Sequence, residues 1–269
     1  MTRQLLCVLL VFLASAGFVA WRVYAVHTYE APQFEIVKDP SASHEGGCES
    51  LAGLTGQALE TNAAGPGSTV TVLVLGDQST AGQPWRMGTY SVPTIRKVFE
   101  GRSAKLRQQE QILRDVSGKC QALRRTTISP IFMGVTQAIA DLRARGCSVS
   151  SHCDLFVDTD LEENVEPVLK KALSKKDGEK WNSLPRLGNS GIDVLFCGVA
   201  VTNGRVHDTS EKREWKFVRR DSSEVHRMQE VWRSLFAEPA TVHFEPYCPV
   251  PGNGATQNVT GASPKQSQF

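Results

Sequence analysis

The ten residues Ile192–Val201, IDVLFCGVAV, form an almost uninterrupted apolar run. Such a run is typical of a β-strand that is buried on both faces of its sheet. Two other apolar runs, Thr69–Leu75 and Cys153–Val157, predict buried strands of the same kind, and Thr241–Phe244 predicts a last strand. Because side chains of a strand point alternately to either face, such a sheet needs helices on both sides.

Segments with helical periodicity lie between these runs. The clearest follows Ser129-Pro130, which predicts an N-cap with proline in the first turn, and its apolar residues recur at three-to-four spacing as far as Leu142. An imperfect helical pattern spans Val92–Val116, a short one spans Val165–Ser174, and Ser222-Ser223 predicts the cap of a helix that reaches Phe236. Alternating strands and helices predict an α/β fold, with a doubly wound, mainly parallel sheet flanked by helices.

The N-terminal segment Leu5–Trp21 carries no charge. Its length is the short limit for crossing about 30 Å of hydrocarbon, and Trp21 and Tyr24 resemble interfacial anchors. We therefore predict that residues 1–24 form one transmembrane helix that acts as a signal anchor, with a cleaved signal peptide as the alternative. Either interpretation places the rest of the chain outside the cytoplasm, in the periplasm or the extracellular space.

The rest of the chain divides into three parts. We predict that residues 25–68 form a linker and a short helix. The linker is predicted because the stretch up to residue 47 is rich in proline, serine and glycine. The α/β domain covers residues 69–248, and the polar tail 249–269 predicts disorder. A net charge of +2 without a long basic block argues against a nucleic-acid partner.

Cysteine usage agrees with an exported domain. Of the seven cysteines, Cys7 lies in the membrane segment, and the other six permit disulfides in fifteen full pairings. Cys147 and Cys153 flank a short loop and are the pair that we predict first. Cys197 lies inside an apolar strand, where a buried free thiol is at least as good an interpretation. The absence of any Cys-x-x-Cys spacing argues against zinc.

The segment Gly76–Gly82, GDQSTAG, follows the Thr69–Leu75 strand, at the edge of the sheet where doubly wound domains bind ligands. It is similar to the first block of the GDSL esterase family, in which a serine after Gly-Asp is the nucleophile. Gln78 stands at that position, Ser79 comes one residue late, and none of the six histidines has an aspartate three residues before it. A GDSL-like hydrolase relic, or another α/β enzyme, is therefore the alternative interpretation.

The run Asp77-Gln78-Ser79-Thr80-Ala81 also resembles the Asp-x-Ser-x-Ser motif of the von Willebrand factor type A domain, which follows the first strand of that domain. In that family the two serines, a threonine from a second loop and an aspartate after a later strand hold a divalent cation, usually magnesium. An acidic group of the partner protein fills the open position of the cation. Oxygen ligands from several loops suit such a hard ion.

The resemblance implies a metal site made of Asp77, Ser79, Thr127 and Asp160, with Thr126 as the alternative to Thr127, for Mg²⁺ or Mn²⁺. Ala81 stands where the motif has its second serine, which implies weak binding. Purely structural roles, a turn at Asp77 and a capping box from Asp160 to Glu163, compete with this interpretation. We predict a membrane-anchored, extracytoplasmic type A-like domain that binds another protein at the cell envelope, with or without the cation, rather than an enzyme.

Overall fold

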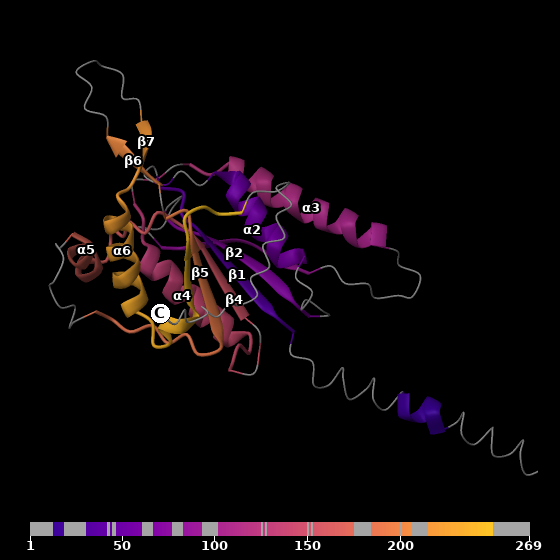
Figure 1. Ribbon diagram of the computed structural model, residues 1–269. Coiled ribbons are helices and arrows are strands. Elements are labelled where there is room, and N and C mark those ends of the chain that lie inside the picture. Colours follow the sequence, from indigo (N-terminus) through magenta and orange to yellow (C-terminus); the bar gives the residue numbers. More distant parts are fainter. Residues whose placement is uncertain are drawn as a thin grey trace, which may run out of the picture.

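The computed structural model describes residues 13–18, 31–41, 44, 47–60, 67–76, 83–92, 102–124, 126, 128–149, 151, 153–174, 184–199, 201–205 and 215–249. In these residues the chain forms an α/β domain with a six-stranded, mostly parallel sheet and a separate two-stranded sheet (Figure 1). The α/β class predicted from the sequence is therefore confirmed.

The large sheet has the spatial order β3 (Trp85–Ser91), β2 (Thr69–Val74), β1 (Gln33–Lys38), β4 (Cys153–Asp158), β5 (Ile192–Cys197) and β8 (Val242–Glu245). β3 runs antiparallel to β2, whereas the other neighbouring pairs are parallel. The antiparallel strands of the small sheet are β6 (Val201–Arg205) and β7 (Trp215–Arg219). The helices around the sheets are α2 (Cys48–Glu60), α3 (Arg102–Gln121), α4 (Ile131–Ala144), α5 (Pro167–Ser174), α6 (Ser222–Ser234) and the short 3₁₀ helix η1 (Pro239–Thr241).

Helices cover both faces of the large sheet. α2 and α3 lie on one face, and α4, α5 and α6 lie on the other (Figure 1). Side chains of β1 alternate between the two cores: Phe34 and Ile36 pack under α2 and α3, and Val37 packs under α4. The sheet is thus buried on both faces, as the apolar runs predict.

The linker predicted for residues 25–47 is wrong at β1, which lies in the middle of the sheet. All of its residues, QFEIVK, are buried, but the charged ones hide the apolar pattern of a buried strand. Arg145 forms an ion pair with Glu35, and Asp158 forms one with Lys38, so each charge is compensated inside the protein. The first strand of the sheet therefore precedes the one predicted at residue 69.

The predicted helix over Val92–Val116 is partly wrong. β3 ends at Ser91, and α3 begins at Arg102 and reaches Gln121, while residues 93–101 lie outside the described part of the chain. β3 is an edge strand with several exposed side chains, so its sequence WRMGTYS lacks the apolar run of the central strands.

The helices predicted after residue 129 are present with small shifts. α4 begins at Ile131, one residue after the start predicted from a cap at Ser129, and α5 begins at Pro167, inside the predicted Val165–Ser174. The N-cap of α6 is Asp221, whose carboxylate accepts a hydrogen bond from the amide of Ser223. The predicted cap at Ser222-Ser223 therefore lies inside the first turn.

β5 is shorter than the apolar run that predicts it. The strand ends at Cys197 because Gly198 adopts a φ of +85°, which favours glycine. A Cβ atom on Gly198 would also lie 2.6 Å from Cε1 of His44, so glycine permits the close approach of the loop that follows β1. The chain then leaves the sheet and enters β6.

Three disulfides join the cysteines outside the N-terminal segment: Cys48–Cys120, Cys147–Cys153 and Cys197–Cys248. The predicted pair of Cys147 and Cys153 is confirmed. The free-thiol interpretation of Cys197 is wrong, because the parallel pairing of β5 with β8 brings Cys248 beside it.

Residues 13–18 are the described part of the predicted membrane segment, and they are helical. Within the described ranges, no helix is both long and apolar enough to cross a membrane. The other residues of segment 1–24, and residues 250–269 of the predicted disordered tail, lie outside the described part of the chain.

Candidate functional site

The carboxyl ends of β1 and β4 lie side by side at the topological switch point of the sheet. From β1 the sheet continues through β2 to β3, and from β4 it continues in the opposite direction through β5 to β8. Doubly wound sheets bind their ligands in the crevice at this point. Asp39 directly follows β1, and Thr159-Asp160 directly follow β4.

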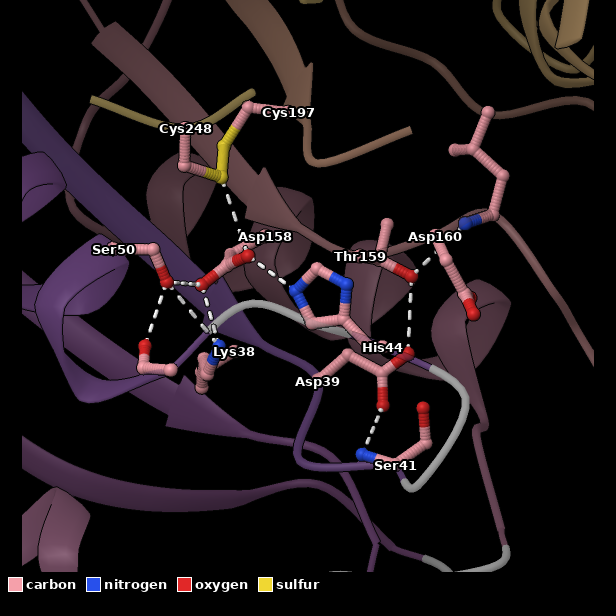
Figure 2. Close-up of polar contacts among 12 residues, drawn as sticks. Lys38, Asp39, Ser41, His44, Ser50, Asp158, Thr159, Asp160, Cys197 and Cys248 are labelled. Carbon is pink, nitrogen blue, oxygen red and sulfur yellow. Dashed lines mark hydrogen bonds and ion pairs between the residues drawn. A yellow bond between two sulfur atoms is a disulfide. The ribbon is translucent and has the colours of Figure 1, made fainter. Parts of the chain in front are cut away.

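Asp39 is a buried junction between the loops at this edge (Figure 2). Its Oδ1 accepts a hydrogen bond from the amide of Ser41 at 2.9 Å. Its Oδ2 accepts one from the hydroxyl of Ser129 at 2.6 Å and one from the hydroxyl of Thr159 at 3.0 Å. The Asp39 carboxylate thus holds the β1 loop, the segment before α4 and the β4 loop together.

The segment before α4 joins the same site through Thr126. The amide of Thr126 donates to the carbonyl of Pro40 at 3.2 Å, and Thr126 pairs with Ser41 in a short parallel bridge. Its hydroxyl donates to the carbonyl of Ile128 at 2.7 Å. Gly76, at the end of β2, has a φ of +71°, and a Cβ atom there would lie 2.9 Å from the Thr126 hydroxyl. The ends of β1, β2 and β4 therefore converge on one loop cluster.

Asp160 is a buried carboxylate with one oxygen left without a hydrogen bond. Oδ1 accepts the amide of Glu162 at 3.0 Å, whereas Oδ2 has no hydrogen-bond partner among the described residues. Burial, followed by the charge of Asp39, raises the pKa of Asp160 to about 6. The cation nearest to Oδ2 is Nη2 of Arg220, at 3.9 Å, so this oxygen still has room for a hydrogen bond or a ligand.

The backbone beside Asp160 is strained. Leu161 has a φ of 66°, in the left-handed region that a leucine rarely adopts. The indole Nε1 of Trp232, from α6, donates to the Leu161 carbonyl at 3.1 Å and holds it in this conformation. Such strain is concentrated at binding sites, where the surrounding structure maintains it.

Replacing Asp160 with asparagine is expected to stabilise the metal-free protein at neutral pH. The folded-state pKa of about 6 exceeds the ordinary 3.8, so this carboxyl contributes its stability below pH 4 and loses it as the pH rises through 6. Wild type and variant should agree in stability near pH 4, and at pH 7.5 the variant should be more stable by about 3 kcal/mol. Urea unfolding in the presence of a chelator measures this difference in the free energy of unfolding. If the difference between wild type and variant does not change with pH, the prediction is wrong.

The N-terminus of α4 differs from its predicted cap. Pro130 occupies the N-cap position and makes no side-chain hydrogen bond, and Ser129 donates to Asp39 instead. The amide of Phe132 donates to the carboxylate of Glu163, at 2.7 Å, from the loop after β4. Burial raises the pKa of Glu163, which these amide hydrogen bonds oppose. The β4 loop therefore holds α4 in place as well as presenting Asp160.

A second buried cluster lies beside the first, around Asp158 (Figure 2). This carboxylate contacts Lys38 Nζ at 2.6 Å, His44 Nε2 at 2.5 Å and the hydroxyl of Ser50 at 2.5 Å. Ser50 donates to the aspartate rather than to His44, so the group is not a Ser-His-Asp nucleophile arrangement.

The sulfurs of Cys197 and Cys248 lie within 4.8 Å of an Asp158 oxygen, a grouping that could bind a metal ion. They are joined in a disulfide, whereas metal binding by cysteine requires thiolates. The Asp158 cluster is therefore structural, and the donors that suit a hard cation are those around Asp39 and Asp160.

Of the predicted metal-site residues, Asp160 lies at the carboxyl end of β4 as its strand predicts. Asp77, Ser79 and Thr127 lie outside the described residues, so their part of the prediction remains a prediction. β2, which precedes Asp77, is separated from β4 by β1.

Asp39 and Ser41 are the site residues that sequence reasoning missed. They begin the run Asp39-Pro40-Ser41-Ala42-Ser43, which has the complete Asp-x-Ser-x-Ser spacing, including the second serine that Ala81 lacks. This run also follows the strand next to β4. The spacing of this run is a signal for a metal-binding loop that the sequence contains. The proline and serine residues of the same stretch, however, indicate a linker.

Comparison with known proteins gives no family: no protein family model matches the chain, and no curated protein matches it. The described structure defines a doubly wound α/β domain with an acidic, oxygen-lined site at its switch point. The donor set fits a hard divalent cation, because all of its atoms are oxygens and one buried carboxylate oxygen accepts no hydrogen bond from the described residues.

Proposed function

We propose that the protein is a membrane-anchored, extracytoplasmic binding protein whose von Willebrand factor type A-like domain holds Mg²⁺ or Mn²⁺ at the end of β1. The observation that carries this proposal is the meeting of Asp39 and Asp160 at the switch point, with Oδ2 of Asp160 buried and without a hydrogen-bond partner among the described residues. The Asp-x-Ser-x-Ser spacing that starts at Asp39 supports it independently.

The ligands follow from the chemistry of the residues. Asp160 would supply a carboxylate oxygen, and Ser41 and Thr126 would supply hydroxyl oxygens. The motif spacing assigns such a role also to Ser43 and, in place of Thr126, to Thr127, both outside the described residues. Asp39 would orient the loop, because its oxygens accept hydrogen bonds from Ser41, Ser129 and Thr159. A bound cation would offer a coordination position to an acidic group of a partner protein.

The disulfides support a location outside the cytoplasm. All six cysteines after the N-terminal segment are paired, and such disulfides persist in oxidising compartments. Together with the uncharged segment Leu5–Trp21, they favour a domain held at the outer side of a membrane.

Titration of the full-length protein, in detergent micelles and after treatment with a chelator, with Mg²⁺ and Mn²⁺ tests the proposal. We expect binding heat and a rise in melting temperature. At ten times a Kd of about 1 mM the stabilisation is about 1.4 kcal/mol. Asp39→Asn and Asp160→Asn should abolish both signals.

Two further variants make this test specific. Asp193→Asn removes an exposed carboxylate on β5 and should bind the cation as the wild type does. Asp77→Asn separates the two possible motif aspartates: if it abolishes binding while Asp39→Asn does not, the site lies at the end of β2. Absence of heat and of a melting-temperature change in the wild type at about 10 mM cation, ten times the Kd above, would contradict the proposal.

A further inference from the structure

Arg220 brings a buried positive charge to the site from a distant part of the sequence. It lies between the end of β7 and Asp221, the N-cap of α6, and its side chain is 1% exposed. Nη1 donates to the backbone carbonyl of Asp160, and Nη2 donates to the carboxylate of Glu162. Both nitrogens therefore hydrogen-bond to the loop that contains Asp160.

The guanidinium acts on the Asp160 carboxylate through its charge rather than through a hydrogen bond. Nη2 lies 3.9 Å from Oδ2 of Asp160, the oxygen without a hydrogen-bond partner among the described residues. The Nε of Arg220 also has no hydrogen-bond partner in the described part of the chain. Arginine stays protonated at every physiological pH, so this charge is permanent. At a buried position it is screened far less than at the surface.

We propose that Arg220 is an internal counter-ion of Asp160 that sets the cation affinity of the site, an inference that rests on the proposed function. Without a divalent cation, Arg220 compensates the charge of Asp160. A cation at Oδ2 of Asp160 lies close to the same guanidinium and is repelled by it. Arg220 therefore keeps cation binding weak, and an acidic group of the partner strengthens it by neutralising part of the excess positive charge.

The position of Arg220 also connects the site to other elements. It joins β7 to α6, and α6 holds the same loop a second time through Trp232 and the Leu161 carbonyl. A substitution of Arg220 can therefore change both the positive charge near Asp160 and the hydrogen bonds that hold the loop of Asp160. Two variants separate these effects: Arg220→Lys keeps the charge and loses the forked donor, whereas Arg220→Gln loses the charge and keeps an amide donor.

The test is calorimetric titration of full-length wild type, Arg220→Gln and Arg220→Lys with Mg²⁺ after chelator treatment, together with melting temperatures. We expect Arg220→Gln to bind Mg²⁺ at least about tenfold more tightly, and Arg220→Lys to stay within about threefold of the wild type. Metal-free Arg220→Gln should melt at a lower temperature than metal-free wild type, and Mg²⁺ should raise its melting temperature more. Arg220→Met replaces the glutamine variant if that variant does not fold, with the same expectations.

The outcomes separate this inference from the proposed function. If the wild type binds Mg²⁺ and the uncharged variant binds it equally or more weakly, the counter-ion role of Arg220 is overturned and the metal site stands. If neither protein binds Mg²⁺, the proposed function is overturned and this inference falls with it. If only the uncharged variant binds Mg²⁺ at about 10 mM, the counter-ion role of Arg220 is supported, while cation binding by the wild type is overturned.

Discussion

The Lys38→Met variant is expected to lose about 3–5 kcal/mol of the free energy of unfolding. Nζ of Lys38 lies 2.6 Å from Oδ2 of Asp158, and the two side chains are 3% and 0% exposed. Without the ammonium group, the carboxylate stays buried with His44 and Ser50 as its remaining polar partners. A buried charge that loses its counter-ion is one of the largest single destabilising changes in proteins.

The same variant should be more sensitive to acid. Burial by itself raises the pKa of Asp158, but the charges of Lys38 and His44 hold it well below its ordinary value. Because the folded-state pKa is lowered, Asp158 contributes stability above an unfolded pKa of 3.8 and loses it as the pH falls. In Lys38→Met the loss begins at a higher pH. Urea unfolding at neutral pH and acid unfolding followed by circular dichroism measure the two effects.

Two controls belong to the Lys38 experiment. Lys171→Met removes an exposed lysine of α5 and should change stability by less than about 0.5 kcal/mol. The double variant Lys38→Met/Asp158→Leu replaces the whole ion pair by apolar side chains and should recover most of the loss. If Lys38→Met costs no more than Lys171→Met, the ion pair does not stabilise the sheet.

Gly191→Ala is expected to cost about 2–5 kcal/mol, from a left-handed backbone conformation and a collision with backbone atoms. Gly191, just before β5, has a φ of +73°. A Cβ atom there would lie 2.7 Å from the backbone nitrogen of Val149 and closer still to the carbonyl of Ser148. The Cys147–Cys153 disulfide closes this loop, so its backbone cannot move aside easily.

Gly146→Ala is the matched control for this substitution. Gly146 also has a positive φ, +94°, but no atom lies within 4 Å of a Cβ placed there. Its replacement should therefore cost only the backbone strain, about 1–2 kcal/mol. Chemical denaturation of both variants gives the comparison, and equal losses would show that the contact with the Ser148-Val149 backbone has no effect.

The predictable strands were those whose side chains are nearly all apolar. β5 and β4 could be identified because a continuous apolar run of strand length is typical of a strand buried on both faces. β1 could not, because Glu35 and Lys38 look like surface residues until their partners are known. Those partners, Arg145 and Asp158, are 110 and 120 positions away in the sequence. Local patterns contain no information about such pairs.

For the candidate site, too, only the residues that follow an apolar strand could be predicted from the sequence. Asp160 follows an evident strand, so its place at the sheet edge could be inferred. Asp39 follows a strand that the sequence conceals, and its Asp-x-Ser-x-Ser run lies in a stretch whose composition indicates a linker. Arg220 gave no local signal, since its relation to Asp160 depends on how the chain returns from β7 to α6.

The direction of β1 has a consequence for how the site is presented. The strand starts at Gln33, two residues after Ala31, and ends at Lys38, next to Asp39. Six residues of extended chain span about 20 Å. A tether attached at Ala31 would thus begin at the opposite end of β1 from the acidic crevice, so it would leave the crevice open to a partner protein.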